Sequence, residues 1–202
     1  NCMWACFSGQ ITAPSTWSKG ENLFAYYNAM EDHNAATWAK IYARIYPNFF
    51  RIEEATEKKG VIYAMAQLTR IYAMQMMASL QGPIPYSKVK SGDIRAAYDD
   101  EPTAWRAMFD DLDNVIAILK SAAELGINQD LAADQFYGGN CEKWMKFANT
   151  LKLRMAIRVS GVADYAQAKA EEAVRGGVLE SVSDSSYDTT SSGINENGYA
   201  IV

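Results

Sequence analysis

The chain has 202 residues, 49% hydrophobic and 21% charged, which is close to the globular average and long enough to bury a core without disulfides or metals. Its net charge of -5 at pH 7 argues against a nucleic-acid surface, because neutralising phosphates needs a clustered excess of Lys and Arg. Polar residues at Gln67, Arg70 and Gln75 interrupt the most apolar run, residues 61–80, so no membrane-spanning helix is expected.

Three cysteines, Cys2, Cys6 and Cys141, are odd in number and cannot form a complete disulfide framework. We expect buried thiols at Cys2 and Cys6, with lipidation of Cys2 as the alternative. The chain starts at Asn1 without a basic segment, an apolar stretch and a cleavage site, so any targeting signal is expected upstream.

The N-terminal segment, residues 8–34, has no sustained hydrophobic period, and its aromatic residues stand among Ser, Thr, Pro, Gly and Asn. Aromatic side chains in such polar segments are more often accessible than those on the apolar stripe of a helix. Trp17, Tyr26 and Tyr27 are therefore candidate ligand-binding residues. The alternative is that they pack against the helical core.

Residues 37–55 predict a first helix, because apolar side chains recur at three- and four-residue steps. Pro47 lies inside this run and should kink the helix or split it in two, since its ring removes a backbone donor. The predicted apolar face carries Trp38, Tyr42, Ile45, Phe49 and Ile52.

Residues 61–79 are apolar nearly all round, which predicts a central helix packed between others. Residues 81–86 follow with two prolines, each of which disfavours helix in the residue before it, so we expect an ordered loop there. The main face of the central helix is predicted to carry Met65, Leu68, Tyr72 and Met76, with Ile71 and Met74 beside it.

Residues 102–126 show the strongest amphipathic pattern. The acidic cluster at residues 99–101 suits the first helical turn before Pro102, and Gly126 can supply a left-handed closing residue. The predicted inner face carries Trp105, Phe109, Leu112, Ile116 and Leu119.

Residues 141–160 and 164–175 predict two helices joined by a short connection, and hence an antiparallel helix hairpin that ends at Gly176 and Gly177. Residues 180–198 are polar and without period, which predicts a loop. The inner face of the first helix is predicted to carry Trp144, Phe147, Leu151, Met155 and Val159. These patterns together predict an all-α fold of irregular, tetratricopeptide-like helix hairpins with long loops, forming one helical region over residues 1–202.

Catalytic chemistry has little support in the sequence. His33 is the only histidine, so zinc sites built from several histidines are excluded and a Ser-His-Asp arrangement depends on one residue. Carboxylates are adjacent at 53–54, 99–101 and 110–111, and neighbouring helical residues point in different directions, so solvated faces are expected rather than an acid/base pair. We expect no cofactor and no bound metal.

Two motifs carry a family resemblance. Residues 134–140 and the following residues 143–158 resemble the signature region of the SusD/RagB-like family, in which a D-x-x-Y-x-G-D turn leads into a kW-x-kFANSLKLRLAIR helix. Asn140 stands where the family often has Asp, and Thr150 where it often has Ser; both are conservative for a turn and a helix surface. Residues 82–87 resemble the G-x-[IV]-P-Y-[ST] turn of the same family.

The resemblance covers residues 38–184 and is closest to the SusD-like starch-binding branch that associates with the outer membrane. It implies a non-catalytic subunit on the extracellular face, held by a lipid anchor outside this chain, that binds oligosaccharide or peptide for a TonB-dependent transporter. Family members are longer, so this chain is expected to be the N-terminal-to-middle part. The motifs are scaffold motifs, and no ligand-binding residue is carried over through them.

Two other functions fit the helical pattern. A helical-repeat scaffold that binds another protein through a groove is the first alternative, since helix hairpins alone equally support it. An all-helical glycosidase ranks third. An upstream lipobox and a neighbouring transporter gene would favour the nutrient-binding lipoprotein, whereas a cytosolic start would favour the scaffold.

Overall fold

The computed structural model describes residues 38–92, 95–127, 134 and 136–181. The chain divides into two compact units, Asn1–Ile45 and Tyr46–Val202. In the first unit, residues 38–45 are helical and include a π-helical segment, η2, over Ile41–Ile45.

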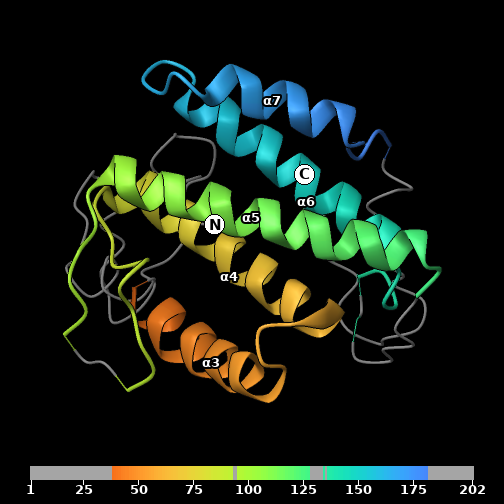
Figure 1. The fold of residues 1–202 in the computed structure, drawn as a ribbon. Helices are drawn as coiled ribbons and strands as arrows, with labels where there is room; N and C mark the ends of the chain where they lie inside the picture. Colours follow the sequence, from red (N-terminus) through yellow and green to blue (C-terminus); the bar gives the residue numbers. More distant parts are fainter. Residues whose placement is uncertain (1–37, 93–94, 128–133, 135, 182–202) are drawn as a thin grey trace, which may run out of the picture. The chain divides into compact units, whose positions relative to one another are not determined.

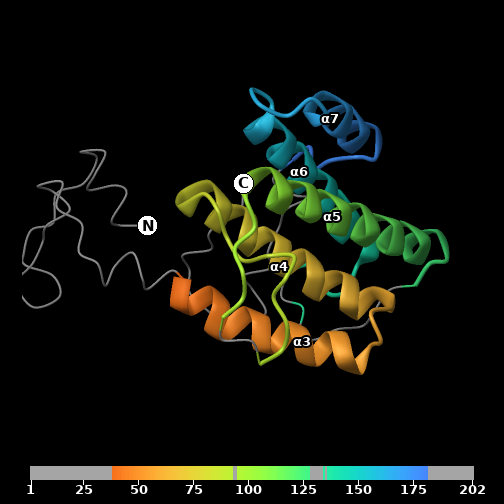
Figure 2. The same ribbon diagram turned by 60° about the vertical axis from the view of Figure 1, so that its left-hand side comes forward.

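The second unit contains α3 (Tyr46–Ala55), α4 (Gly60–Gln81), α5 (Glu101–Glu124), α6 (Cys141–Val159) and α7 (Ala166–Arg175), which follow one another in space as they do in the chain (Figures 1 and 2). Each helix packs on the next from α3 to α7, and α4 also contacts α6. Within the described ranges there is no strand, only an isolated antiparallel bridge between Ile84 and Asp99. The predicted all-α fold is confirmed.

The helix type changes just before Pro47. The π-helical segment ends at Ile45 and α3 begins at Tyr46, so Pro47, which cannot donate a backbone hydrogen bond, lies in the first turn of α3 directly after the π-helical segment. Tyr46 and Phe49 are buried in the core of the second unit, whereas Ile52 is only half-buried.

Helix α4 is the central helix, as predicted, because it packs against α3, α5 and α6. Its predicted face was wrong at the C-terminal end: Met76 is 42% exposed and Tyr72 half-buried, whereas Met77 is fully buried. A helix covered on three sides buries side chains around most of its circumference, so periodicity does not identify the one strip that faces solvent.

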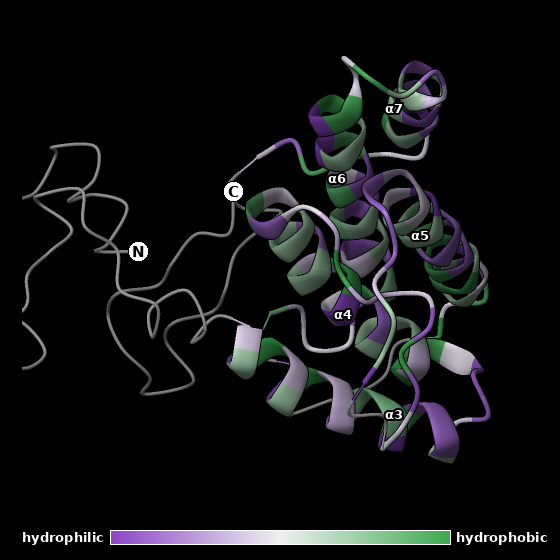
Figure 3. Ribbon diagram, turned by 90° about the vertical axis from the view of Figure 1, so that its left-hand side faces the viewer, coloured by the Kyte–Doolittle hydropathy of each residue, from purple (hydrophilic) through white to green (hydrophobic). Residues whose placement is uncertain are grey.

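Helix α5 begins and ends close to where the sequence predicts. Asp100 is the N-cap and accepts a hydrogen bond from the Thr103 amide at 2.9 Å, and Pro102 lies in the first turn. Gly126, with φ +67°, follows the helix in the left-handed region. Figure 3 shows hydrophobic and hydrophilic stretches alternating along α5, which matches the predicted amphipathic pattern.

Asp99 is buried rather than solvated, which corrects the sequence-based expectation. Its carboxylate accepts hydrogen bonds from the backbone amides of Tyr86 (3.1 Å) and Ser87 (2.7 Å) and from the Ser87 hydroxyl (2.8 Å). Asp99 therefore fastens the ordered loop after α4 to the start of α5.

This contact predicts a pH dependence of stability. Burial acts to raise the pKa of Asp99, but the hydrogen bonds from Ser87 and Tyr86 outweigh it and hold the pKa below its ordinary value. Since the folded pKa is the lower one, the stabilisation is present above the unfolded pKa of about 3.9 and is lost as the pH falls through the folded pKa. We expect Asp99→Asn to lower the free energy of unfolding by about 1–2 kcal/mol at neutral pH. We also expect it to flatten the acid limb of the stability profile, that is, the fall at low pH of the free energy of unfolding measured with urea.

The control for this experiment is Asp110→Asn, because Asp110 is an exposed carboxylate of α5. It should leave both the stability at neutral pH and the acid limb unchanged. An Asp99→Asn protein with the acid limb of the wild type would contradict the assigned role.

Helices α6 and α7 form the predicted hairpin. Asn140 caps α6 by accepting a hydrogen bond from the Lys143 amide at 3.0 Å. Thr150 was expected on the helix surface, but it has an internal contact. Its hydroxyl accepts a hydrogen bond from the Leu179 amide at 2.9 Å, which holds the chain after α7 against α6. The neighbouring Asn149 donates to the Gly176 carbonyl at 2.9 Å.

A buried ammonium group links three helices. The Lys152 side chain is 3% exposed and lies 2.6 Å from a carboxylate oxygen of Asp113 on α5 and 2.7 Å from one of Glu172 on α7. Lys169 of α7 also pairs with Asp113. Both lysines thus anchor α7, which has few buried side chains of its own.

Candidate functional site

The three candidate residues from the sequence, Trp17, Tyr26 and Tyr27, lie outside the described residues. The described part of the second unit contains two sizeable hollows that are formed by other residues.

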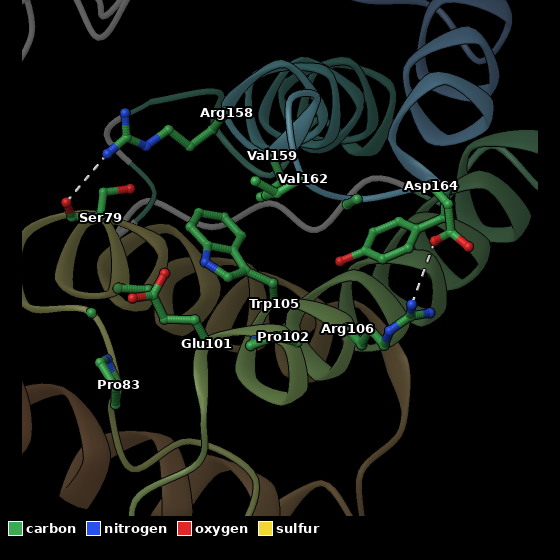
Figure 4. Close-up of a pocket in the computed structure, with 14 residues that line it drawn as sticks. Ser79, Pro83, Glu101, Pro102, Trp105, Arg106, Arg158, Val159, Val162 and Asp164 are labelled. Carbon is green, nitrogen blue, oxygen red and sulfur yellow. Dashed lines mark hydrogen bonds and ion pairs between the residues drawn. The ribbon is translucent and has the colours of Figure 1, made fainter.

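The first hollow is a groove of about 810 Å³ where the C-terminal end of α4, the start of α5 and the α6–α7 connection meet. Figure 4 shows Trp105 in the middle of this groove, with Arg158 to one side and the Arg106–Asp164 pair to the other. Trp105 is only 5% exposed, so it forms part of the floor rather than a free stacking surface.

Three of the four charged groups that line this groove have partners. Arg106 lies over the Tyr165 ring, 4.4 Å from its centroid, and pairs with Asp164 at 3.5 Å. Arg158 donates a hydrogen bond to the Ser79 carbonyl at 3.4 Å. The groove therefore offers a mixed apolar and charged surface.

The second hollow, the polar pocket, has a volume of about 920 Å³ and lies among α3, α4, α5 and the loop that follows α4. Four carboxylates and three basic groups line it, and three aromatic residues contribute to its wall. The residues that carry the argument below are Phe50, Glu53, Tyr63, Gln67, Arg70, Tyr86 and Asp111.

Arg70 is the centre of a polar cluster in this pocket. Its Nη2 donates to Asp111 Oδ2 at 2.7 Å and to the Tyr86 hydroxyl at 3.2 Å, and that hydroxyl donates to Asp111 Oδ2 at 2.6 Å. The guanidinium also stacks on the rings of Phe49 and Tyr86, 4.4 and 4.6 Å from their centroids. The cluster joins α4, α5 and the loop between them.

The tyrosines and the arginine of this region keep their protonation states at neutral pH. Burial raises the pKa of Tyr46 to about 12 and that of Tyr86 well above its ordinary value, so both phenols stay protonated. Burial acts to lower the pKa of Arg70, but the tyrosine oxygens and the Asp111 carboxylate outweigh it, and the net direction is upward. Arg70 is a permanent buried cation.

The adjacent carboxylates noted in the sequence differ in their exposure and in their partners. Asp110 is exposed, as expected, but Asp111 is bound to the buried Arg70, which corrects the prediction of a solvated face. Glu53 pairs with Lys58 at 3.3 Å. In these contacts each carboxylate neutralises a cation, an arrangement that differs from an acid/base pair across a cleft.

Among the described residues, no group of three or more His, Cys, Asp or Glu side chains could hold a metal ion. The same residues include no helix long and apolar enough to cross a membrane.

Sequence reasoning missed Gln67 and Arg70 as site residues. The available signal was the interruption of an apolar run by polar residues, which we used only as an argument against a membrane span. A buried polar residue in a central helix requires a partner, and this requirement could have marked α4 as one wall of a polar site.

Comparison with known proteins gives one family. The family model for SusD-like proteins, described as Susd and RagB outer membrane lipoprotein, matches residues 2–202. No curated protein matches the chain.

Several solved structures are similar to this chain. A SusD-like protein from Bacteroides thetaiotaomicron VPI-5482 is 70% identical, with a TM-score of 0.88 over 100% of this chain and 42% of that one. A SusD homolog from Bacteroides ovatus ATCC 8483 is 34% identical, with a TM-score of 0.78 over 89% of this chain and 37% of that one. A chitin-binding SusD homolog from Flavobacterium johnsoniae is 28% identical, with a TM-score of 0.77 over 91% of this chain and 41% of that one. The chain thus spans about two fifths of the length of these relatives.

Proposed function

Because this chain belongs to the SusD/RagB family of outer membrane lipoproteins, we propose that the protein captures oligosaccharides at the cell surface for uptake by a TonB-dependent transporter. In this proposal the protein is lipid-anchored on the extracellular face of the outer membrane and does not cleave its ligand. The observation that carries the proposal is the similarity to chitin-binding relatives along most of the chain.

The internal organisation of the second unit supports a binding role. The half-exposed carboxylate of Asp111 pairs with the buried Arg70, and the buried carboxylate of Asp99 holds a loop through Ser87. Such contacts stabilise a scaffold that can present a ligand surface. We propose that residues 1–202 form one helical region of the longer protein.

The proposed ligand surface includes Trp17, Tyr26 and Tyr27. Sugar rings place their C–H faces on Trp and Tyr rings, while polar neighbours bind the hydroxyl groups. Asn22, Asn28 and Glu21 are close in sequence and can supply such polar contacts.

Isothermal titration of the full-length protein against chitohexaose, maltohexaose and cellohexaose tests this function. We expect at least one oligosaccharide to bind and to be recovered intact after prolonged incubation. Trp17→Ala should weaken its binding by about 1–3 kcal/mol, by analogy with base–aromatic stacking, without changing the circular dichroism spectrum.

Tyr98→Ala is a suitable control, because Tyr98 is an aromatic residue outside the proposed surface and 59% exposed. It should bind like the wild type. Failure to bind any saccharide, or time-dependent release of shorter sugars by the repurified protein, would refute the proposed function. Wild-type affinity in the Ala variants of Trp17, Tyr26 and Tyr27 would refute only this ligand surface.

A further inference from the structure

We propose that the polar pocket is a binding subsite for a neutral sugar unit, with Gln67 as its contact residue. This inference rests on the proposed function and adds to it a site on the helices themselves. It begins from one buried polar side chain.

Gln67 and Arg70 lie three residues apart on α4 and so share one face of the helix. Both line the pocket, and they are only 1% and 8% exposed. In the part of the chain that the structure describes, Gln67 Oε1 accepts no hydrogen bond. The Arg70 side chain, in contrast, interacts with the side chains of Tyr46, Tyr86 and Asp111. Buried polar atoms in native proteins are rarely left unpaired, because each then loses its hydration without compensation.

The same helix provides a comparison. Gln75 is also buried in α4, at 3% exposure, but it does not line the pocket. Its Nε2 donates a hydrogen bond to the Tyr72 carbonyl at 3.2 Å. The side-chain amide of the buried glutamine away from the pocket therefore has an internal hydrogen bond, whereas no hydrogen bond among the described residues involves the side-chain amide of Gln67.

The chemistry of this side chain defines the ligand class. Gln67 Oε1 requires a hydrogen-bond donor, and a sugar hydroxyl or an acetamido N–H supplies one. The charged groups that line the pocket are four carboxylates and three basic groups, so the lining has no excess of positive charge that would favour an anionic ligand: Glu53, Glu54, Glu57 and Asp111 against Lys58, Arg70 and Lys90. A neutral polar ligand fits this balance.

The shape and the wall of the pocket agree with this class. A volume of about 920 Å³ falls within the range of small-molecule sites and exceeds one sugar ring. Phe50 and Tyr63 contribute aromatic surface beside the polar atoms, and apolar rings pack against the C–H faces of sugars. The pocket thus combines the two kinds of contact that a saccharide requires.

Gln67→Leu in the full-length protein is the decisive variant. Leu is similar in size and removes the unpaired oxygen, so the melting temperature should stay the same or rise if the fold is intact. We expect the affinity for the best oligosaccharide among chitohexaose, maltohexaose and cellohexaose to fall about tenfold, as one lost hydrogen bond to a ligand implies. Gln75→Leu is the matched control and should keep wild-type affinity.

The outcomes separate this inference from the function on which it rests. Oligosaccharide binding that Gln67→Leu weakens and Gln75→Leu leaves unchanged would support the subsite. Wild-type affinity in Gln67→Leu would overturn the subsite and leave the proposed function intact. If Gln67→Leu does not fold, Gln67→Met takes its place with the same expectation. Absence of saccharide binding by the wild type, or capture of tripeptides that depends on Gln67, would overturn both.

Discussion

Trp144→Ala is expected to lower the free energy of unfolding by about 3–5 kcal/mol, in the range of large-to-small substitutions in protein cores. The Trp144 side chain is nearly buried, at 8% exposure, and its ring meets those of Tyr137 and Phe147 edge-on, at 5.2 and 5.8 Å between centroids. Its indole N–H donates to Asp134 Oδ2 at 2.6 Å. That carboxylate also accepts hydrogen bonds from three backbone amides of the turn before α6, so the substitution releases the turn as well as the core.

Urea unfolding monitored by circular dichroism measures this effect. Trp144→Phe keeps a ring but removes the indole N–H, so it should cost less, about 1–2 kcal/mol. Ile157→Ala lies on the same helix at a 63% exposed position and should change the stability by less than about 0.5 kcal/mol. An unfolding midpoint of Trp144→Ala equal to that of the wild type would show that the ring does not pack as described.

The elements of the fold that depend on local sequence could be predicted well. Helix α5 has a capping residue, a proline in its first turn and a closing glycine, and all three act over distances of a few residues. The turn before α6 was likewise recognisable from a motif that contains both Asp134 and Asn140. Local signals of this kind need no knowledge of what lies across the core.

The parts that could not be predicted depend on partners far apart in the chain. Arg70 and Asp111 are separated by 41 residues, and nothing in the local pattern of either helix indicates that they meet. Lys152 lies on an amphipathic helix, and the helical period alone gives no sign that it is buried between α5 and α7. Periodicity shows which face of a helix is apolar, but it does not identify the partner of a polar residue that interrupts that face.

Prediction of the candidate site from the sequence was limited for the same reason, because its residues come from distant segments of the chain. The polar pocket is formed by residues from α3, α4, α5 and the loop after α4, and each segment contributes only a few side chains. Trp17, Tyr26 and Tyr27 were chosen because they are close in sequence, and they remain predictions. A site assembled from distant segments becomes visible only when the packing of the helices is known.

Asp111→Ala should destabilise the protein by about 2–3 kcal/mol, because it leaves the buried Arg70 cation without its counter-charge. Removing one partner of a fully buried ion pair costs about 3–5 kcal/mol, and the lower value here reflects the partial exposure of Asp111, whose side chain is 35% exposed. The Tyr86 hydroxyl also loses its acceptor in this variant. Asp110→Ala, one residue earlier on the exposed side of α5, should change the stability by less than about 0.5 kcal/mol.

A double-mutant cycle with Arg70→Met separates the charge from the packing. Met removes the cation that Asp111→Ala would strand, while its flexible side chain still fills part of the space between Phe49 and Tyr86. The double variant should therefore be less destabilised than the sum of the two single variants, with a coupling of about 1–2 kcal/mol in urea unfolding. Strict additivity would mean that Arg70 and Asp111 do not stabilise one another, and that the Arg70 cation is held in the core by its aromatic contacts and its hydrogen bond to the Tyr86 hydroxyl.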